Sequence, residues 1–88
     1  MDEMDSRISR CESMLVDACR EAGFWISGDG RINESAACEL LGYSQTYLKQ
    51  LRAEGKSPPH FRIPARGGQV SYRLGDIAGW VEERREEF

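Results

Sequence analysis

The sequence offers few residues for catalysis. It contains one histidine, His60, and three cysteines that lack the Cys-x-x-Cys spacing of a zinc site: Cys11, Cys19 and Cys38. No Gly-x-Ser-x-Gly, His-Glu-x-x-His or phosphate-loop pattern occurs, and no two carboxylates stand out as an acid–base pair. The sequence therefore predicts no enzyme, no metal site and no cofactor, and it indicates reduced thiols in a cytoplasmic protein.

Cations and amides in the middle of the chain indicate a different chemistry, the binding of an anion. The net charge of the 88 residues is −3, but residues 31–76 contain seven basic and four acidic side chains. The segments on either side are acidic. Because the local field decides where an anion binds, this basic segment is compatible with DNA binding by an acidic protein.

Two short helices joined by a glycine turn are predicted for residues 33–55. Asn33 can cap the first helix and Gly42 can end it. Ser44 can cap the second, which runs to about Glu54. This spacing is typical of a helix-turn-helix.

The second helix has a polar side that suits contacts with bases and phosphates. Leu48 and Leu51 mark its inner side, whereas the outward residues are small, amide or cationic. An ordinary solvated helix face is the alternative. The predicted recognition residues are Ser44, Gln45, Thr46, Lys49, Gln50 and Arg52, with Lys56 as a further phosphate contact.

A two-stranded hairpin, or wing, is predicted for residues 60–73, where apolar and polar residues alternate on both sides of two glycines. The apolar residues expected to share one face are Phe61, Ile63, Val70 and Tyr72. The glycine tip allows a close approach to a phosphate or a minor groove. The predicted contacts are Arg66, Gly67 and Gly68, and the alternative is a plain surface hairpin with a solvated arginine.

Amphipathic helices are predicted at both ends of the chain. The apolar residues of the first follow a heptad-like spacing: Met4, Ile8, Cys11, Leu15, Ala18 and Ala22. It either packs on its own domain or forms a dimer as a coiled coil. The last helix spans about 75–87, with Asp76 as its cap and Trp80 as a core aromatic residue.

These elements predict a mainly α fold with a small β wing, that is, a winged helix-turn-helix with an extra N-terminal amphipathic helix. Residues 1–23 form that helix and residues 24–88 the DNA-binding domain, in which a Gly28-Asp29-Gly30 turn precedes the helix pair. The longest strongly apolar run is three residues, against about 20 for a membrane helix. We therefore expect no membrane partner.

The segment from Asn33 to about Glu83 resembles the excisionase-like winged helix-turn-helix proteins, which are small phage and plasmid proteins related to the DNA-binding domain of mercury-resistance regulators. The resemblance rests on A-x-E-L-L-G-x-S at 37–44, E-G-K-S-P-P at 54–59 and D-x-x-x-W at 76–80. It implies sequence-specific binding of double-stranded DNA, with the second helix in the major groove. By position, it implies that Gln45, Thr46, Lys49 and Gln50 read bases and that Arg62, Arg66 and Arg73 are wing contacts.

The resemblance implies an excisionase-like architectural factor in DNA recombination or a phage transcription regulator. One module of this size covers about 600–1,000 Å² of its own surface on DNA, which favours binding as a homodimer or a cooperative array. One alternative is the DNA-recognition domain of a phage terminase small subunit. Another is a protein-interaction module whose N-terminal helix docks on an integrase or a packaging motor.

Overall fold

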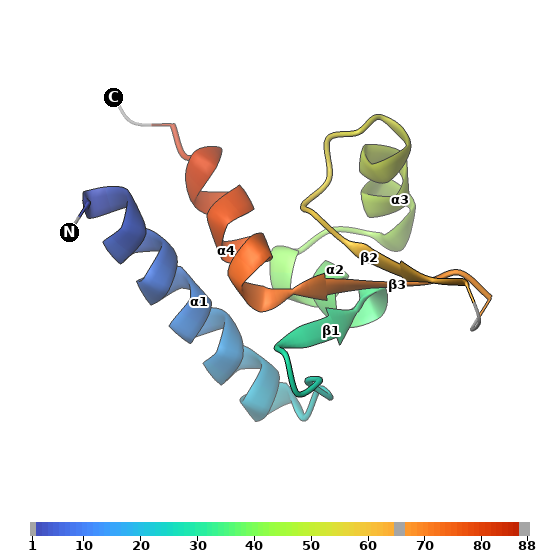
Figure 1. Ribbon diagram of the computed structural model, residues 1–88, viewed down its shortest axis with the longest axis horizontal. Helices are drawn as coiled ribbons and strands as arrows, with labels where there is room; N and C mark the ends of the chain where they lie inside the picture. The colour runs from blue at the N-terminus through green and yellow to red at the C-terminus, as the bar shows by residue number, and fades with distance from the viewer. Residues whose placement is uncertain (1, 65–66, 87–88) are drawn as a thin grey trace.

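The computed structural model describes residues 2–64 and 67–86, which form four helices and a three-stranded antiparallel sheet (Figure 1). The expected mainly helical class with a small sheet is confirmed. No described helix combines the length and apolar character needed to cross a membrane. The elements are α1 (Glu3–Ala22), β1 (Arg31–Asn33), α2 (Glu34–Leu41), α3 (Gln45–Ala53), β2 (Phe61–Ile63), β3 (Gln69–Arg73) and α4 (Leu74–Glu83).

The ends of α2 and α3 follow from the sequence. The side chain of Asn33 accepts a hydrogen bond from the Ala36 N–H at 2.8 Å, and the Ser44 hydroxyl accepts one from the Tyr47 N–H at 3.0 Å. Both side chains satisfy an N–H group that has no partner within its own helix. Gly42 ends α2 in the left-handed conformation, with φ 74°, which a residue with a Cβ adopts only under strain.

The start of α4 differs from the prediction. Asp76 lies inside the first turn, because the helix begins two residues earlier at Leu74 and has no side-chain cap. β3 runs directly into α4, and the Leu74 N–H donates to the Gly30 carbonyl at 2.8 Å. That backbone bond satisfies one of the first N–H groups of α4, which have no partner within the helix.

The prediction that Phe61 and Ile63 share a face with Val70 and Tyr72 is wrong. In the observed register Phe61 lies opposite Ser71 and Ile63 opposite Gln69. Residues directly opposite each other share a face, so Phe61 and Ile63 lie on the outer face of the sheet. Tyr72 lies on the inner face with Ile32, its partner in β1. The register depends on the length of the loop, and a one-residue slip moves each side chain to the other face.

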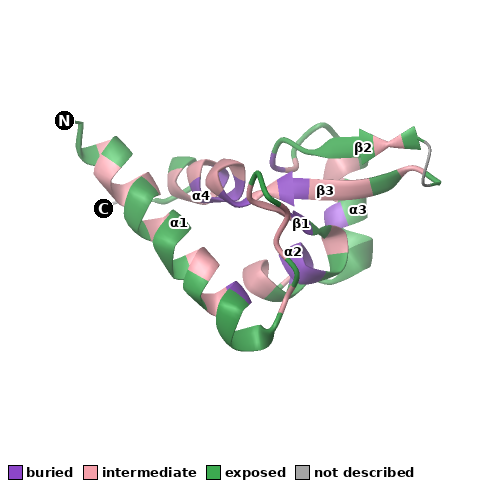
Figure 2. Ribbon diagram, turned by 60° about the horizontal axis from the view of Figure 1, so that its bottom comes forward, coloured by how far each residue is buried: buried purple, intermediate pink, exposed green. Residues whose placement is uncertain are grey.

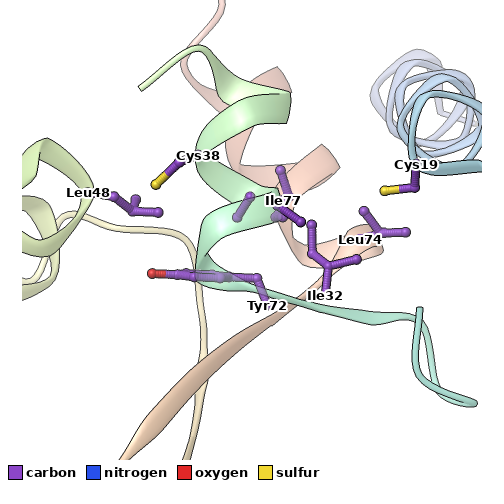
Figure 3. Packing of buried hydrophobic residues seen from close by; sticks show 9 residues of the cluster. Cys19, Ile32, Cys38, Leu48, Tyr72, Leu74 and Ile77 are labelled. Carbon is purple, nitrogen blue, oxygen red and sulfur yellow. The ribbon is translucent and has the colours of Figure 1, made fainter. Parts of the chain in front are cut away.

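The sheet packs through its inner face against the helices. Ile32, Tyr72 and Ile77 are fully buried in a cluster to which α1 contributes Cys19 (Figure 3). α1 packs along α4 of its own domain, as one of the two interpretations of this helix expects (Figure 1). The residues of the predicted stripe from Met4 to Ala18 are half-buried, however, Ala22 is exposed, and the buried residue of α1 is Cys19.

The three cysteines are free thiols. Cys19 and Cys38 are buried. Their burial raises the pKa of both thiols, because a desolvated thiolate is costly. Both residues therefore act as small apolar core residues.

Candidate nucleic-acid interface

α3 turns a polar side toward solvent because its apolar residues are few and lie together. Leu48 is fully buried and Leu51 half-buried, and both pack in or against the core. The solvent-exposed residues of α3 and its cap are Ser44, Gln45, Thr46, Tyr47, Lys49, Gln50 and Ala53. The helix itself contains no acidic residue. No carboxylate within the helix therefore repels a phosphate backbone, and the nearest one along the chain is that of Glu54, directly after α3.

The side chains of three predicted recognition residues make different contacts within the protein. The Ser44 hydroxyl accepts the capping bond from Tyr47. The Gln50 amide donates to the Glu54 carboxylate at 3.2 Å, on the exposed surface. Lys49 has no ion-pair partner in the described part of the chain. Lys49 is therefore the cation of α3 that is available to an external anion.

Arg52 is placed differently from the prediction. Its guanidinium donates two hydrogen bonds to the Glu34 carboxylate, at 2.8 Å from Nε and 2.9 Å from Nη2. The Tyr72 hydroxyl donates to the same carboxylate at 2.9 Å. The Arg52 side chain is 11% exposed. Arg52 therefore joins α3 to α2 and β3, and we remove it from the recognition residues.

In the hairpin, the side chain of Arg62 makes a local contact. Arg62 donates from Nη1 to the Gly68 carbonyl at 3.1 Å, which braces the base of the glycine tip. Gly67 and Gly68 both have positive φ, 71° and 75°, so the turn there requires glycine. Gly67 is exposed and Gly68 half-buried. The expected contact of Arg66 lies outside the described residues.

Arg73 is bound by a carboxylate that the sequence analysis did not single out. Asp29 accepts hydrogen bonds from Arg73 Nη2 at 3.0 Å, from Arg31 Nε at 2.9 Å and from the Ser27 hydroxyl. The guanidinium groups of Arg31 and Arg73 also lie 5.3 and 5.0 Å from the centre of the Phe61 ring. Arg73 is therefore not free to bind DNA unless Asp29 releases it.

The hydrogen bonds to Asp29 lower the pKa of its carboxyl group. The bond from Ser27 contributes most, followed by those from Arg31 and Arg73. A lowered folded-state pKa contributes stability above the unfolded value of about 3.9, and that stability is lost as the pH falls. We expect the melting temperature of Asp29→Asn to lie below that of wild type at pH 7, with a difference that shrinks below about pH 4. Thermal melts from pH 2 to 7 measure this.

The matched control is Asp17→Asn, which removes an exposed carboxylate of α1. Its melting temperature should follow that of wild type at each pH. A constant difference between Asp29→Asn and wild type from pH 2 to 7 would show that ionisation of Asp29 does not stabilise the fold.

The sequence analysis also missed a cation at the end of α4. The Arg84 guanidinium lies 4.2 Å from the centre of the Trp80 ring, and its Nη1 donates to the Trp80 carbonyl at 3.1 Å. Among the described residues Arg84 has no ion-pair partner. The sequence pattern around it, two acids on each side, indicated only a solvated helix end. Stacking of this kind holds a guanidinium in place for an anion.

Trp80 connects this part of α4 to the segment around α3. Its Nε1 donates to the Lys56 carbonyl at 3.1 Å. Its ring packs edge-to-face against the Tyr43 ring, with the two ring centres 6.2 Å apart. The Lys56 ammonium lies 3.8 Å from Glu54, with a side chain that is 70% exposed. Lys56 therefore remains accessible at the C-terminal end of α3, as its predicted role requires.

The acidic α1 helix lies away from these groups. Figures 1 and 2 show α1 at one side of the molecule, with α3 and the hairpin at the other. The carboxylates of α1 therefore do not cover α3 or the hairpin.

In the described ranges, 2–64 and 67–86, no group of three or more His, Cys, Asp or Glu side chains has the arrangement of a metal site. Comparisons of the chain with models of protein families, with curated proteins and with solved structures returned no match.

Proposed function

We propose that this protein binds double-stranded DNA in a sequence-specific manner through α3 and the β2–β3 hairpin. One observation carries the proposal: α3 has an exposed face with Gln45, Thr46, Lys49 and Gln50 and without an acidic residue. Amide side chains can pair with adenine and lysine with guanine in the major groove. The contacts of the hairpin are then Arg62, Gly67 and Gly68, together with Arg66 as the sequence predicts.

The proposed fold type is a winged helix-turn-helix. A left-handed glycine joins α2 to α3, and the β2–β3 hairpin lies on the same side of the molecule as α3 (Figure 1). These two features support the proposal because helix and wing together follow a duplex. Arg84, stacked on Trp80 at the end of α4, is a further candidate for a phosphate contact.

The resemblance to excisionase-like proteins supports a role as an architectural factor in recombination or as a phage transcription regulator. The DNA-recognition domain of a terminase small subunit is the alternative within the same binding class. The protein acts in the cytoplasm in this proposal, where free thiols persist.

A protein-interaction module is the second candidate function, and one observation favours it. Met14, on the side of α1 away from the core, is 70% exposed. Such a side chain suits contact with a partner such as an integrase or a packaging motor. In this case the helix-turn-helix is a scaffold only.

Polarisation titrations of labelled genomic DNA fragments at two salt concentrations separate the two functions. DNA binding releases counterions and therefore weakens with salt. An affinity that falls with salt and differs between fragments supports the proposal. Absence of salt-dependent binding to all fragments would overturn it in favour of the interaction module.

Lys49→Ala should lower the slope of log K against log salt by about 0.9, because one fewer phosphate charge is neutralised. The matched control is Arg10→Ala, which removes an exposed cation of α1 on the other side of the molecule. Titration of both variants over a salt series measures the two slopes. If both variants change the slope equally, the effect comes from net charge and α3 is not the contact surface.

A further inference from the structure

Tyr47 is an exposed aromatic residue in the first turn of α3, to which the sequence analysis assigned no role. The residue is 46% exposed. The first turn of a recognition helix is the part that lies deepest in the major groove. A tyrosine places a hydroxyl group, which can donate a hydrogen bond, at the end of a rigid ring. Tyr47 therefore has the position and the chemistry to contact DNA.

The ring of Tyr47 is held by other aromatic rings. It packs edge-to-face against the Tyr43 ring, with the two ring centres 4.9 Å apart. Tyr43 packs in the same way against Trp80 of α4, and the Trp80 Nε1 donates to the Lys56 carbonyl. Trp80 is 8% exposed, so this row of rings ends in the core. Because Tyr47 is held before any ligand binds, it loses less conformational entropy on binding.

Tyr47 and Lys49 lie on opposite flanks of the exposed face of α3. Successive residues of an α-helix are about 100° apart, so these two are separated by about 160° around the axis. The Lys49 flank is on the side of Arg52, which is about 60° from Lys49 and binds Glu34 of α2. The Tyr47 flank is on the side of Tyr43 and α4.

The exposed residues Thr46 and Gln50 lie between these flanks. The major groove of B-DNA is about 12 Å wide, and a helix with its side chains is about 10–12 Å across. A helix in this groove therefore turns the middle of its exposed face to the base edges and its two flanks to the two phosphate backbones. In this orientation Tyr47 and Lys49 face different strands.

We propose that the Tyr47 hydroxyl binds a phosphate of one DNA strand, while Lys49 lies against the backbone of the other strand. The hydroxyl donates a hydrogen bond to a phosphate oxygen. Contacts of this kind fix the register of a protein on the duplex and do not read the sequence. The proposal rests on the proposed function and deepens it, because it assigns the two flanks of α3 to the two strands.

The experiment uses the genomic fragment that the wild-type protein binds most tightly in the polarisation titrations. Tyr47→Phe keeps the ring and removes the hydroxyl, so it should weaken binding at least about fivefold. The slope of log K against log salt should stay unchanged, because a neutral hydroxyl releases no counterion. Tyr43→Phe is the matched control, since it removes a hydroxyl that has no role in this proposal, and it should bind like wild type. Thermal melts show whether both variants fold.

Methylphosphonate substitution, which removes the charge of one phosphate, locates the contacts on the strands. Each phosphate of the bound duplex is replaced in turn, and binding of the wild type, Tyr47→Phe and Lys49→Ala is compared. Tyr47→Phe should lose sensitivity to a substitution on one strand, and Lys49→Ala to a substitution on the other. Loss of sensitivity on the same strand in both variants would overturn the strand assignment.

The remaining outcomes separate this proposal from the proposed function. If Tyr47→Phe binds DNA like wild type, or if Tyr43→Phe weakens binding equally, the phosphate contact of Tyr47 is wrong, whereas DNA binding by α3 stands. If the wild-type protein binds no fragment, the proposed function is overturned, and the role of Tyr47 with it.

Discussion

Trp80→Ala is expected to lower the free energy of unfolding by about 3–5 kcal/mol, a large part of the stability of a small domain. Trp80 is 8% exposed. It donates a hydrogen bond to the Lys56 carbonyl, and it packs against Tyr43 and Arg84. The alanine variant loses the buried ring and leaves the Lys56 carbonyl without its donor. Urea denaturation of both proteins measures the change.

Trp80→Phe is the matched control, because it keeps an aromatic ring but removes the N–H donor. It should cost about 1–3 kcal/mol, from the lost hydrogen bond and the smaller ring. A Trp80→Ala variant that unfolds at the same urea concentration as wild type would show that α4 is peripheral to the fold.

The sequence predicted the features of this fold that depend on neighbouring residues. Asn33 and Ser44 cap helices because a short polar side chain can reach an N–H group three residues later. Gly42 ends α2 because glycine adopts positive φ without strain. The outward side of α3 followed from the positions of Leu48 and Leu51 alone.

The features that were predicted wrongly depend on residues far apart in the chain. Alternation within each strand was read correctly, but alternation is the same for two registers one residue apart. Phe61 therefore was assigned to the wrong face. The start of α4 depends on a bond between Leu74 and Gly30, which are 44 residues apart in sequence. No local pattern contains that information.

The assignment of cations to DNA contacts has the same limit. Arg52 and Lys49 look alike in the sequence, since both are cations in a helix with few apolar residues. Their roles differ because Glu34, 18 residues away from Arg52, lies next to one and not the other. Arg73 is bound in the same way by Asp29, 44 residues away. Charge counts over a segment therefore overestimate the cations that are free to bind DNA.

If α3 and the hairpin contact the same duplex, the ion pair between Arg52 and Glu34 orients α3 relative to the hairpin. The Glu34 carboxylate receives hydrogen bonds from α3 through Arg52 and from β3 through Tyr72, and it belongs to the first residue of α2. One carboxylate of α2 thus connects α3 with β3 of the hairpin, the two parts of the proposed interface. We expect this connection to hold the side chains of α3 in position relative to the hairpin.

Arg52→Ala is expected to destabilise the protein by about 2–3 kcal/mol, less than the replacement of Trp80. The variant leaves the Glu34 carboxylate, whose side chain is 20% exposed, without its main partner. Tyr72→Phe removes one neutral donor and should cost about 1–1.5 kcal/mol. Urea denaturation of the single and double variants forms a double-mutant cycle for the two bonds to Glu34.

The cycle distinguishes a connected cluster from two independent contacts. If Glu34 joins α3 to β3, the two replacements interact, and the cost of the double variant differs from the added single costs by at least about 0.5 kcal/mol. Arg62→Ala, at an exposed arginine that binds only within the hairpin, should show no such coupling to Tyr72→Phe. Additive costs for the Arg52 and Tyr72 variants would contradict the cluster. They would mean that the packing of Leu48 and Leu51, without this carboxylate, orients α3 relative to the hairpin.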